Sequence, residues 1–336
     1  MNYVRHFRKE YLMKLLIVGP YFFSYTEAIS KEINRRNTKC FTFNEIHSNS
    51  VFIKIAYRLN LSFLFRRKII RHRKNLYSFI DSNQISDVLF ISPDVISKDF
   101  LLEVKKRARV HLYMWDGFGN KKNALSVLKH FNTKSSFDML DCNSYDMRYI
   151  PLFAESVYRA KNIEKIYDLS FCGTMHSDRP SWIKILLKYS DENKLRIGLF
   201  LYYYSPILLF IRLALNKFYF NLFSKVSYNP ISKEKIADLF RKSRVVVDLT
   251  HPNQIGLTSR TFEALRTGSK LATNNKNCKI LMEQFPSRIF IFGKDDIQQK
   301  AFLDFINFDL EPLNEKQDKF LSVERFTDQI LETIND

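Results

Sequence analysis

The stretch Val245–Asn275, VVVDLTHPNQIGLTSRTFEALRTGSKLATNN, predicts a β-strand, a glycine-containing turn, a short helix and a second strand in close succession. The β-branched run at its start favours the first strand. Thr258 or Ser259 can cap the N-terminus of the helix, and Gly268 can end it. The residues Lys270–Thr273 then resume an extended pattern. Such a unit is typical of a parallel α/β domain.

A helix N-terminus is therefore expected soon after Gly256. Its backbone N–H groups and the positive end of the helix dipole favour an anion such as phosphate, and Arg260 adds a guanidinium group in the first turn. Glu263 lies about one turn further on, where a carboxylate suits the paired hydroxyls of a ribose or sugar. The segment predicts a nucleotide-sugar site, although the same unit occurs in parallel α/β domains whatever they bind.

The part of this stretch from His251 to Asn275 resembles the donor-binding segment of GT-B glycosyltransferases, in particular the CgeB-like group and related bacterial surface-polysaccharide transferases. In those enzymes a Glu followed by Ala, with a Gly shortly after, lies at the donor ribose, and Glu263, Ala264 and Gly268 match that pattern. Many GT-B families carry a further Glu upstream, where this chain has Ile255. Its absence fits the CgeB-like group better and speaks against a retaining mechanism that depends on that carboxylate.

The resemblance implies a donor site built from two segments. The first contributes Gln254, Gly256, Leu257, Thr258, Ser259, Arg260 and Glu263. The second is YDLSFCGTMHSDRPSWIKIL, again with the pattern of a strand, a turn and a helix. We expect Gly173 and Thr174 in its turn and Arg179 at the start of its helix, where Pro180 suits the first helical position. In GT-B enzymes this loop faces the donor diphosphate.

The chain has 336 residues and 46% hydrophobic content, enough for two domains of ordinary size. Strands expected at Lys14–Val18, Val88–Ile91 and Val110–Met114, with helices between them, indicate a parallel sheet. We expect an α/β fold with two Rossmann-like domains facing across a cleft, the GT-B arrangement. The acceptor-side domain is expected to span residues 1–155 and the donor domain 156–336, with the terminal helix packing back toward the first domain.

Asp116 follows one of these strands and is expected at the carboxyl end of the sheet, where open α/β sheets bind ligands. It is the candidate catalytic residue, a general base for the acceptor, although it can equally cap a turn with Gly117. After the first strand, the sequence GPYFFS has one Gly and bulky aromatic residues. It therefore lacks the glycine-rich dinucleotide fingerprint, which argues against a dehydrogenase.

We expect neither a metal centre nor a cofactor. The cysteines occur singly, at Cys40, Cys142, Cys172 and Cys278. There is no Cys/His cluster and no DxD-type motif. Free thiols in a reducing cytosol are the ordinary interpretation of such cysteines, and the location is expected to be cytoplasmic. The nucleotide sugar is then a substrate rather than a cofactor.

The net charge is +18, and the excess is clustered. The stretch 51–80 has no carboxylate and contains Lys54, Arg58, Arg66, Arg67, Lys68, Arg71, Arg73 and Lys74. A second acid-free stretch, 193–233, includes a largely apolar helix expected at Pro206–Ser224, either plain core or membrane-interfacial. The run at 66–74 can be a solvated helix face, an anionic-lipid patch or a nucleic-acid patch. We expect peripheral contact with the anionic inner face of the cell membrane.

These observations favour a metal-independent glycosyltransferase. It would move a sugar from a nucleotide-sugar donor to a lipid-linked or lipopolysaccharide or capsule glycan acceptor, without nucleic acid as a partner. The alternative is a non-catalytic basic α/β protein that binds nucleic acid or an anionic surface. Against nucleic acid, the aromatic residues at 62–79 lie in apolar runs and are not dispersed among basic residues as stacking side chains.

Overall fold

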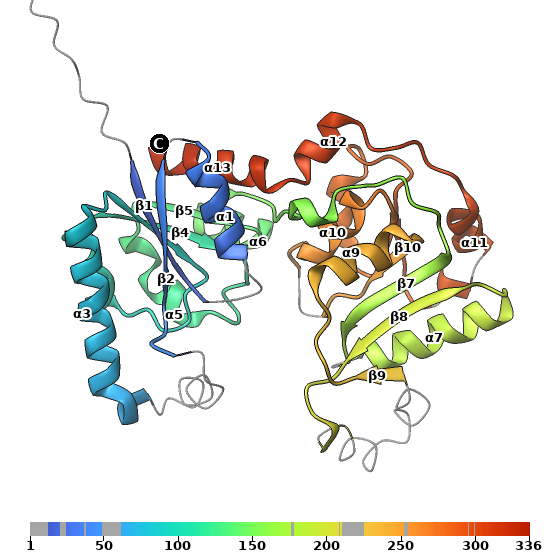
Figure 1. Cartoon of the computed structure of the whole chain (residues 1–336), viewed down its shortest axis with the longest axis horizontal. Coiled ribbons are helices and arrows are strands. Elements are labelled where there is room, and N and C mark those ends of the chain that lie inside the picture. The colour runs from blue at the N-terminus through green and yellow to red at the C-terminus, as the bar shows by residue number, and fades with distance from the viewer. Residues whose placement is uncertain are drawn as a thin grey trace, which may run out of the picture. The chain divides into compact units, whose positions relative to one another are not determined.

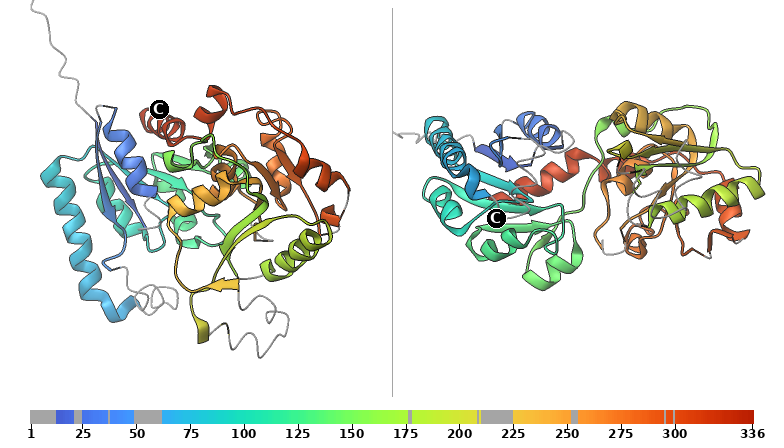
Figure 2. Two further views of the ribbon diagram at one scale, coloured as in Figure 1. Left: turned by 45° about the vertical axis from the view of Figure 1, so that its right-hand side comes forward. Right: turned by 90° about the horizontal axis from the view of Figure 1, so that it is seen from below.

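The computed structural model describes residues 13–20, 25–36, 38–48, 62–175, 178–207, 209, 225–251, 255–294, 296–298 and 300–336 (Figure 1). The chain divides into two compact units. One runs to Pro151 and includes Phe326–Asp336, and the other is Leu152–Arg325. Each unit contains a six-stranded sheet with helices around it (Figure 2).

The sheet of the first unit is parallel throughout, in the order β2-β1-β3-β4-β5-β6. Its strands are β1 (Lys14–Gly19), β2 (Lys39–Asn44), β3 (Asp87–Ile91), β4 (Arg109–Met114), β5 (Thr133–Ser136) and β6 (Arg148–Tyr149). Its helices are α1 (Tyr25–Asn34), α3 (Arg66–Asn83), α4 (Lys98–Lys105), α5 (Lys122–Val127) and α6 (Met139–Tyr145), with 3-10 turns η1 (Ser62–Phe65) and η2 (Leu128–His130). The strands expected near Lys14, Val88 and Val110 are confirmed.

Alternation along the buried strands distributes their side chains between two cores. In β4, Leu112 packs with residues of α3 and α4 in one core. Tyr113 points to the opposite face and meets Phe326 of α13 (Val323–Asn335), with ring centroids 4.9 Å apart. Arg36, just past α1, forms an ion pair of 2.9 Å with Asp328 of the same helix. The terminal helix thus contributes its later residues to the first unit.

The sheet of the second unit is also parallel, in the order β12-β11-β10-β7-β8-β9. Its strands are β7 (Tyr167–Thr174), β8 (Ile197–Tyr202), β9 (Val226–Ser227), β10 (Ser243–Asp248), β11 (Lys270–Thr273) and β12 (Ile289–Ile291). Its helices are α7 (Arg179–Glu192), α9 (Lys233–Arg241), α10 (Ser259–Arg266), α11 (Lys300–Asn307) and α12 (Glu315–Phe320), with 3-10 turns η3 (Ser156–Tyr158), η5 (Lys276–Leu281) and η6 (Asp296–Gln298).

The strand–helix–strand unit predicted from Val245 onward is confirmed as β10, α10 and β11. After the last residue of α10, Gly268 adopts a φ of 80°, a left-handed conformation that glycine accepts without steric strain. The helix expected from Pro206 to Ser224 lies almost entirely outside the described residues. In the part of the chain that is described, no helix is both long enough and apolar enough to cross a membrane.

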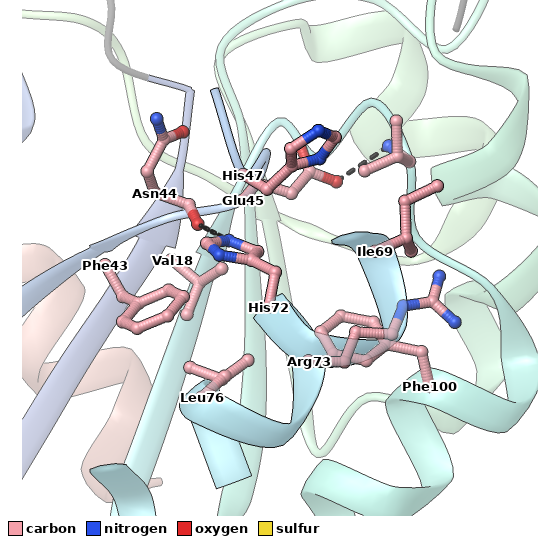
Figure 3. Close-up of a pocket in the computed structure, with 11 residues that line it drawn as sticks. Val18, Phe43, Asn44, Glu45, His47, Ile69, His72, Arg73, Leu76 and Phe100 are labelled. Carbon is pink, nitrogen blue, oxygen red and sulfur yellow. Dashed lines mark hydrogen bonds between the residues drawn. The ribbon is translucent and has the colours of Figure 1, made fainter. Parts of the chain in front are cut away.

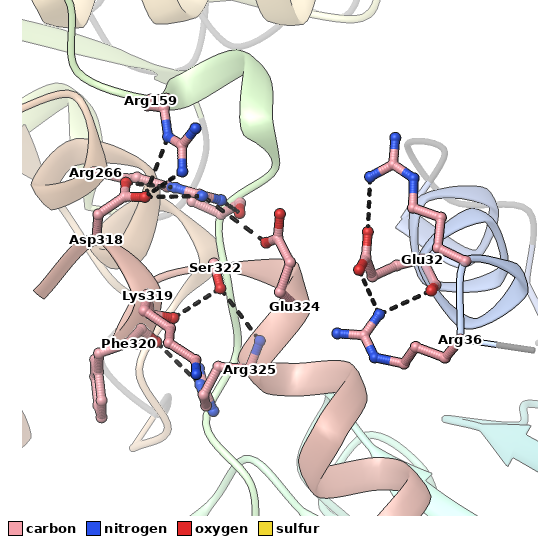
Figure 4. A network of polar contacts seen from close by, with 12 residues as sticks. Glu32, Arg36, Arg159, Arg266, Asp318, Lys319, Phe320, Ser322, Glu324 and Arg325 are labelled. Atoms are coloured by element: carbon pink, nitrogen blue, oxygen red, sulfur yellow. Dashed lines mark hydrogen bonds and ion pairs between the residues drawn. The ribbon is translucent and has the colours of Figure 1, made fainter. Parts of the chain in front are cut away.

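Arg266, at the end of α10, is buried and ties together the two ends of the second unit (Figure 4). Its Nη1 donates to the carbonyl of Ala154 at 2.6 Å, and its Nε donates to Asp318 at 3.1 Å. Arg159 donates to the same Asp318 carboxylate at 2.9 Å. The C-terminal end of α10 is therefore held firmly, which fixes the direction of its N-terminal end.

Candidate functional site

The N-terminus of α10 lies at the carboxyl edge of the second sheet, where β10 ends. Of the two candidate caps, Thr258 is the one used: its hydroxyl accepts the backbone N–H of Thr261 at 3.2 Å. The same hydroxyl donates to the Asp248 carboxylate at 2.7 Å, and the Thr261 hydroxyl does so at 2.9 Å. Asp248 is the last residue of β10, so these bonds fasten the helix terminus to the end of a central strand.

Asp248 was not predicted as a site residue. It is buried, and burial raises its pKa, while the two threonine hydroxyls and the positive charges of Arg260 and Arg179 oppose that rise. Its hydrogen bonds with the hydroxyls of Thr258 and Thr261 show that it anchors the N-terminus of α10. A carboxylate at the last position of a buried strand is the sequence signal that identifies such a residue.

Arg260 and Glu263 face one another across the first turn of α10, as their spacing predicted. The Arg260 Nη1 donates to Glu263 Oε2 at 2.8 Å, and the guanidinium carbon lies 5.0 Å from the centre of the Phe240 ring. The Glu263 carboxylate is buried. It also hydrogen-bonds Tyr158 of η3, and burial followed by the charge of Glu263 raises the pKa of this phenol. Tyr158 is a further residue that the sequence did not reveal.

Gly173 and Thr174 are the last two residues of β7, which corrects their expected place in a turn. The strand is longer because its pairing with β8 continues to Thr174 and Tyr202. A Cβ atom on Gly173 would lie 2.8 Å from the Phe171 ring, so the backbone here tolerates no side chain without movement. Arg179 begins α7, as expected.

The Arg179 guanidinium bridges the ends of two neighbouring strands. Its Nε and Nη2 donate to the carbonyl of Leu249, just after β10, at 3.1 and 2.9 Å. Its Nη1 donates to the carbonyl of Thr174, at the end of β7, at 3.1 Å. Burial lowers its pKa. Because β7 and β10 are adjacent and parallel, this arrangement places a guanidinium at the same sheet edge as the N-terminus of α10.

The loop before α10 is only partly described, and Gln254 lies outside the described residues. Gly256 and Leu257 are buried, and Ser259, the first residue of α10, is partly exposed. The side-chain amide of Asn275 donates to the Gly256 carbonyl at 3.3 Å. The loop is thereby tied to the chain that follows β11.

Asp116, the predicted base, belongs to the first unit and follows β4. Its backbone N–H donates to the Ser92 hydroxyl at 3.2 Å, and its carboxylate accepts the Asn120 side-chain amide at 3.0 Å. The Asn120 N–H donates to the Gly117 carbonyl at 3.0 Å, so a turn begins directly after Asp116. The partly exposed carboxylate at the sheet edge is compatible with both interpretations made from the sequence.

The chemistry of the edge in the second unit suits an anion. It combines an N-terminal turn with two guanidinium groups, while Asp248 is engaged by two hydroxyls. Among the residues that the structure describes, no three His, Cys, Asp or Glu side chains are grouped so as to hold a metal ion.

A scan against protein-family models gives no match, and neither does a comparison with curated proteins. Solved structures are similar over nearly the whole chain. Anabaena HepE in complex with UDP-glucose has 11% identity and a TM-score of 0.61, covering 96% of this chain and 99% of that chain. AviGT4, a glycosyltransferase involved in avilamycin A biosynthesis, has 12% identity and a TM-score of 0.60, covering 96% and 97%. This chain has the GT-B fold.

The same fold is found in UDP-GlcNAc 2-epimerase from Methanocaldococcus jannaschii, with 11% identity, a TM-score of 0.58, and coverage of 96% of this chain and 99% of that chain. The predicted fold class, with two parallel sheets flanked by helices, is confirmed. At these identities the similarity concerns the fold, and the particular group of enzymes is a separate question.

Proposed function

We propose that this protein is a glycosyltransferase that takes its sugar from a nucleotide-sugar donor bound at the N-terminus of α10. The observation that carries the proposal is the Thr258-capped terminus, anchored on Asp248 at the sheet edge where Arg179 and Arg260 also lie. The similarity in fold to HepE, solved with UDP-glucose, supports it. The resemblance around Glu263 to the CgeB-like group supports the same assignment from the sequence.

Each group has a distinct role in this proposal. The N–H groups of the first turn of α10 and the Arg260 guanidinium bind the donor diphosphate, and Glu263 accepts hydrogen bonds from ribose or sugar hydroxyls. Gly173 and Thr174 form the neighbouring edge of the sheet, where glycine has no side chain and leaves its backbone accessible to the donor in this proposal. Arg179 holds the two strand ends and adds positive charge near the diphosphate.

The departing nucleoside diphosphate needs its developing negative charge stabilised. In this proposal fixed groups supply that stabilisation, namely the helix terminus and the two guanidiniums, so transfer is independent of a divalent metal and of any cofactor. A general base must take the proton from the acceptor hydroxyl, and Asp116 is the proposed base. Its position at the carboxyl end of β4 supports this role.

The proposed acceptor is a lipid-linked or lipopolysaccharide or capsule glycan, met at an anionic membrane surface. Support comes from α3, whose exposed side chains include Arg66, Arg67, Lys68, Arg71 and Lys74. No acidic side chain lies in the first turn of that helix. Basic residues near an anionic leaflet each contribute about 1 kcal/mol to binding.

The experiment that tests the donor site is a thermal-shift screen of UDP, GDP, CMP and their sugars, run beside a titration with single- and double-stranded nucleic acid. A ligand at about 100 times its Kd stabilises the folded protein by about 2.7 kcal/mol. We expect one family of nucleotides to stabilise the protein, and nucleic acid to leave it unchanged. Stabilisation by nucleic acid alone would show that the donor proposal is wrong.

Turnover then separates transfer from epimerisation, since epimerases share the fold. The stabilising nucleotide sugar is incubated with the protein and followed by proton NMR. Slow release of free sugar and nucleoside diphosphate is expected of a transferase that lacks its acceptor. Appearance of a nucleotide sugar inverted at C2, with no release, would identify an epimerase.

A further inference from the structure

The first unit has a small pocket at the carboxyl edge of its sheet, between the end of β2 and the inner face of α3 (Figure 3). It encloses a cavity of about 20 Å³, room for roughly one water-sized group. Two histidines line it, His47 from the loop after β2 and His72 from α3, with their ring centres 6.4 Å apart. The pocket belongs to a different unit from the proposed donor site.

His47 is the unusual member of this pocket. Both of its ring nitrogens are buried, and neither has a hydrogen-bond partner among the described residues. His72, by contrast, places its Nε2 2.8 Å from the Asn44 carbonyl. Buried polar atoms in folded proteins are nearly always paired, so these two ring nitrogens are atoms to which a ligand can hydrogen-bond.

The charges around His47 favour an anionic partner. From α3, Arg73 lines the pocket and stacks over Phe100 with 4.7 Å between guanidinium and ring centre, and the exposed Lys68 is close enough to influence His47. Burial lowers the pKa of His47, and the positive charges of His72 and Lys68 lower it further. An anion bound here would remove that repulsion and favour the imidazolium form, which donates from both nitrogens.

The negative groups nearby are already engaged. The two oxygens of Glu45 accept the backbone N–H groups of Asp94 at 2.8 Å and Val95 at 2.7 Å, and burial raises the pKa of this carboxyl to about 7. Asp94 itself forms an ion pair with Lys121. With these carboxylates paired or partly neutral, the positive charges of α3 dominate the pocket.

We infer that this pocket binds the phosphate group of a phosphate ester, with His47 as the hydrogen-bond donor and the positive charges of α3 beside it. The cavity admits about one phosphate oxygen, so the rest of the group lies at the mouth with its ester bond outward. An apolar side chain lies close to His47, since the centre of the Phe65 ring is 6.1 Å from the centre of the His47 ring. An apolar ester group therefore fits better than a free phosphate ion.

The test measures binding of hexyl phosphate, inorganic phosphate and hexanol by calorimetry at pH 6 and pH 8. Both phosphates are expected to bind more tightly at pH 6, since binding favours protonation of His47. Tighter binding of hexyl phosphate than of inorganic phosphate identifies an ester as the source, and the reverse identifies the free ion. In the wild-type protein, proton NMR of the His47 ring should show its pKa rising when hexyl phosphate is added.

The variants are His47→Phe, which keeps the ring shape without its nitrogens, and His47→Gln, which keeps one donor. His130→Phe is the matched control, because His130 is another histidine of this unit whose pKa is lowered by burial and then by neighbouring lysines. His47→Phe should weaken hexyl phosphate about tenfold or more at pH 6, His47→Gln less, and His130→Phe not at all.

Three results would overturn the inference: no phosphate binding at either pH, equal losses in His47→Phe and His130→Phe, or hexanol binding as tightly as hexyl phosphate. None of them bears on nucleotide binding, which uses residues of the second unit. The inference about the phosphate pocket and the proposal about the donor site are therefore tested independently of each other.

Discussion

The Arg260 guanidinium lies 2.8 Å from the Glu263 carboxylate, and the two side chains differ sharply in exposure, 24% against 3%. Glu263 is also hydrogen-bonded to the buried Tyr158. The two groups that the proposed site assigns to different parts of the donor therefore contact each other directly. Donor binding should draw Arg260 toward the diphosphate and release an oxygen of Glu263 for a hydroxyl.

This relationship predicts different ligand profiles for two substitutions. Glu263→Gln preserves shape but removes a charged acceptor, which should cost about 1.5–3 kcal/mol, or roughly ten- to hundredfold in donor affinity. Arg260→Ala should weaken nucleoside diphosphate much more than nucleoside, because the guanidinium acts on phosphate. Calorimetric titrations with UDP, UDP-sugar and uridine measure both effects, with other bases substituted if the screen favours them.

Arg35→Ala is the matched control, since Arg35 also pairs with a glutamate three residues away, Glu32, at 2.9 Å. It should leave nucleotide binding unchanged. If Glu263→Gln and Arg260→Ala lower the melting temperature but bind every nucleotide as tightly as wild type, the pair serves the fold alone.

Gly173→Ala should disturb the same edge by steric contact. The added methyl would lie 2.8 Å from the Phe171 ring and 3.5 Å from Arg179 Nη1, and overpacking of this kind costs about 1–3 kcal/mol. We expect lower stability and weaker donor binding, and partial recovery of both when Phe171→Leu is added. Gly119→Ala is the control, because a Cβ there meets nothing within 4 Å. Equal stability of the two alanine variants would contradict the prediction.

Local signals predicted the part of the site that depends on neighbours in the sequence. The capping threonine, the terminating Gly268 and the β-branched run before Asp248 act within a few residues, so β10, α10 and β11 could be predicted in order. Gly173 and Thr174 were misplaced because a long-range pairing with β8 extends β7 to its last residue. No pattern within the β7 sequence itself predicts that the strand extends to Thr174.

The residues that were missed act through distant contacts. Tyr158 meets Glu263 only after η3 folds against α10, and Asp248 acquires its role from two threonines on the following helix. In the first unit, His47 and His72 lie far apart in the sequence, and their rings meet only because β2 and α3 are neighbours in the fold. The basic run on α3 was recognised, but its pocket-facing side was not.

Transfer should proceed without a divalent metal, because the proposed site offers amides and guanidiniums as the groups that stabilise charge. The rate of nucleoside diphosphate release in the presence of EDTA is expected to equal the rate with Mg²⁺ within about twofold. This is measured after dialysis, so that bound ions are removed first. Loss of activity in EDTA with recovery on adding Mg²⁺ or Mn²⁺ would show that a metal carries part of the leaving-group charge.

The exposed basic residues of α3 should produce salt-sensitive membrane binding. The protein is expected to sediment with vesicles of anionic phosphatidylglycerol and to remain in solution with neutral phosphatidylcholine, with binding falling as ionic strength rises. Arg67→Glu with Arg71→Glu should abolish sedimentation. Lys122→Glu with Lys129→Glu makes the same change in charge on α5 and η2 and should retain it. Equal sedimentation with both vesicle types would indicate a merely solvated helix face.

Stability of the first unit should depend on pH through Asp87, whose buried carboxylate lies 3.0 Å from His111 Nε2 and 2.8 Å from Arg109 Nε. Burial alone would raise its pKa, but hydrogen bonds from His111 and Ser86 and the charge of Arg109 outweigh it and hold the pKa below its usual range. A depressed pKa contributes stability that is present above the unfolded value, about 4, and is lost as pH falls through the folded value.

Urea denaturation from pH 7 to pH 2.5, followed by Trp115 fluorescence in a Trp182→Phe background, should show this loss. Asp87→Asn should be less stable at pH 7 by about 1–3 kcal/mol and flatter below pH 4, whereas the exposed control Asp146→Asn should follow the parent. Parallel curves for Asp87→Asn and the parent would mean that this carboxylate is not the group responsible.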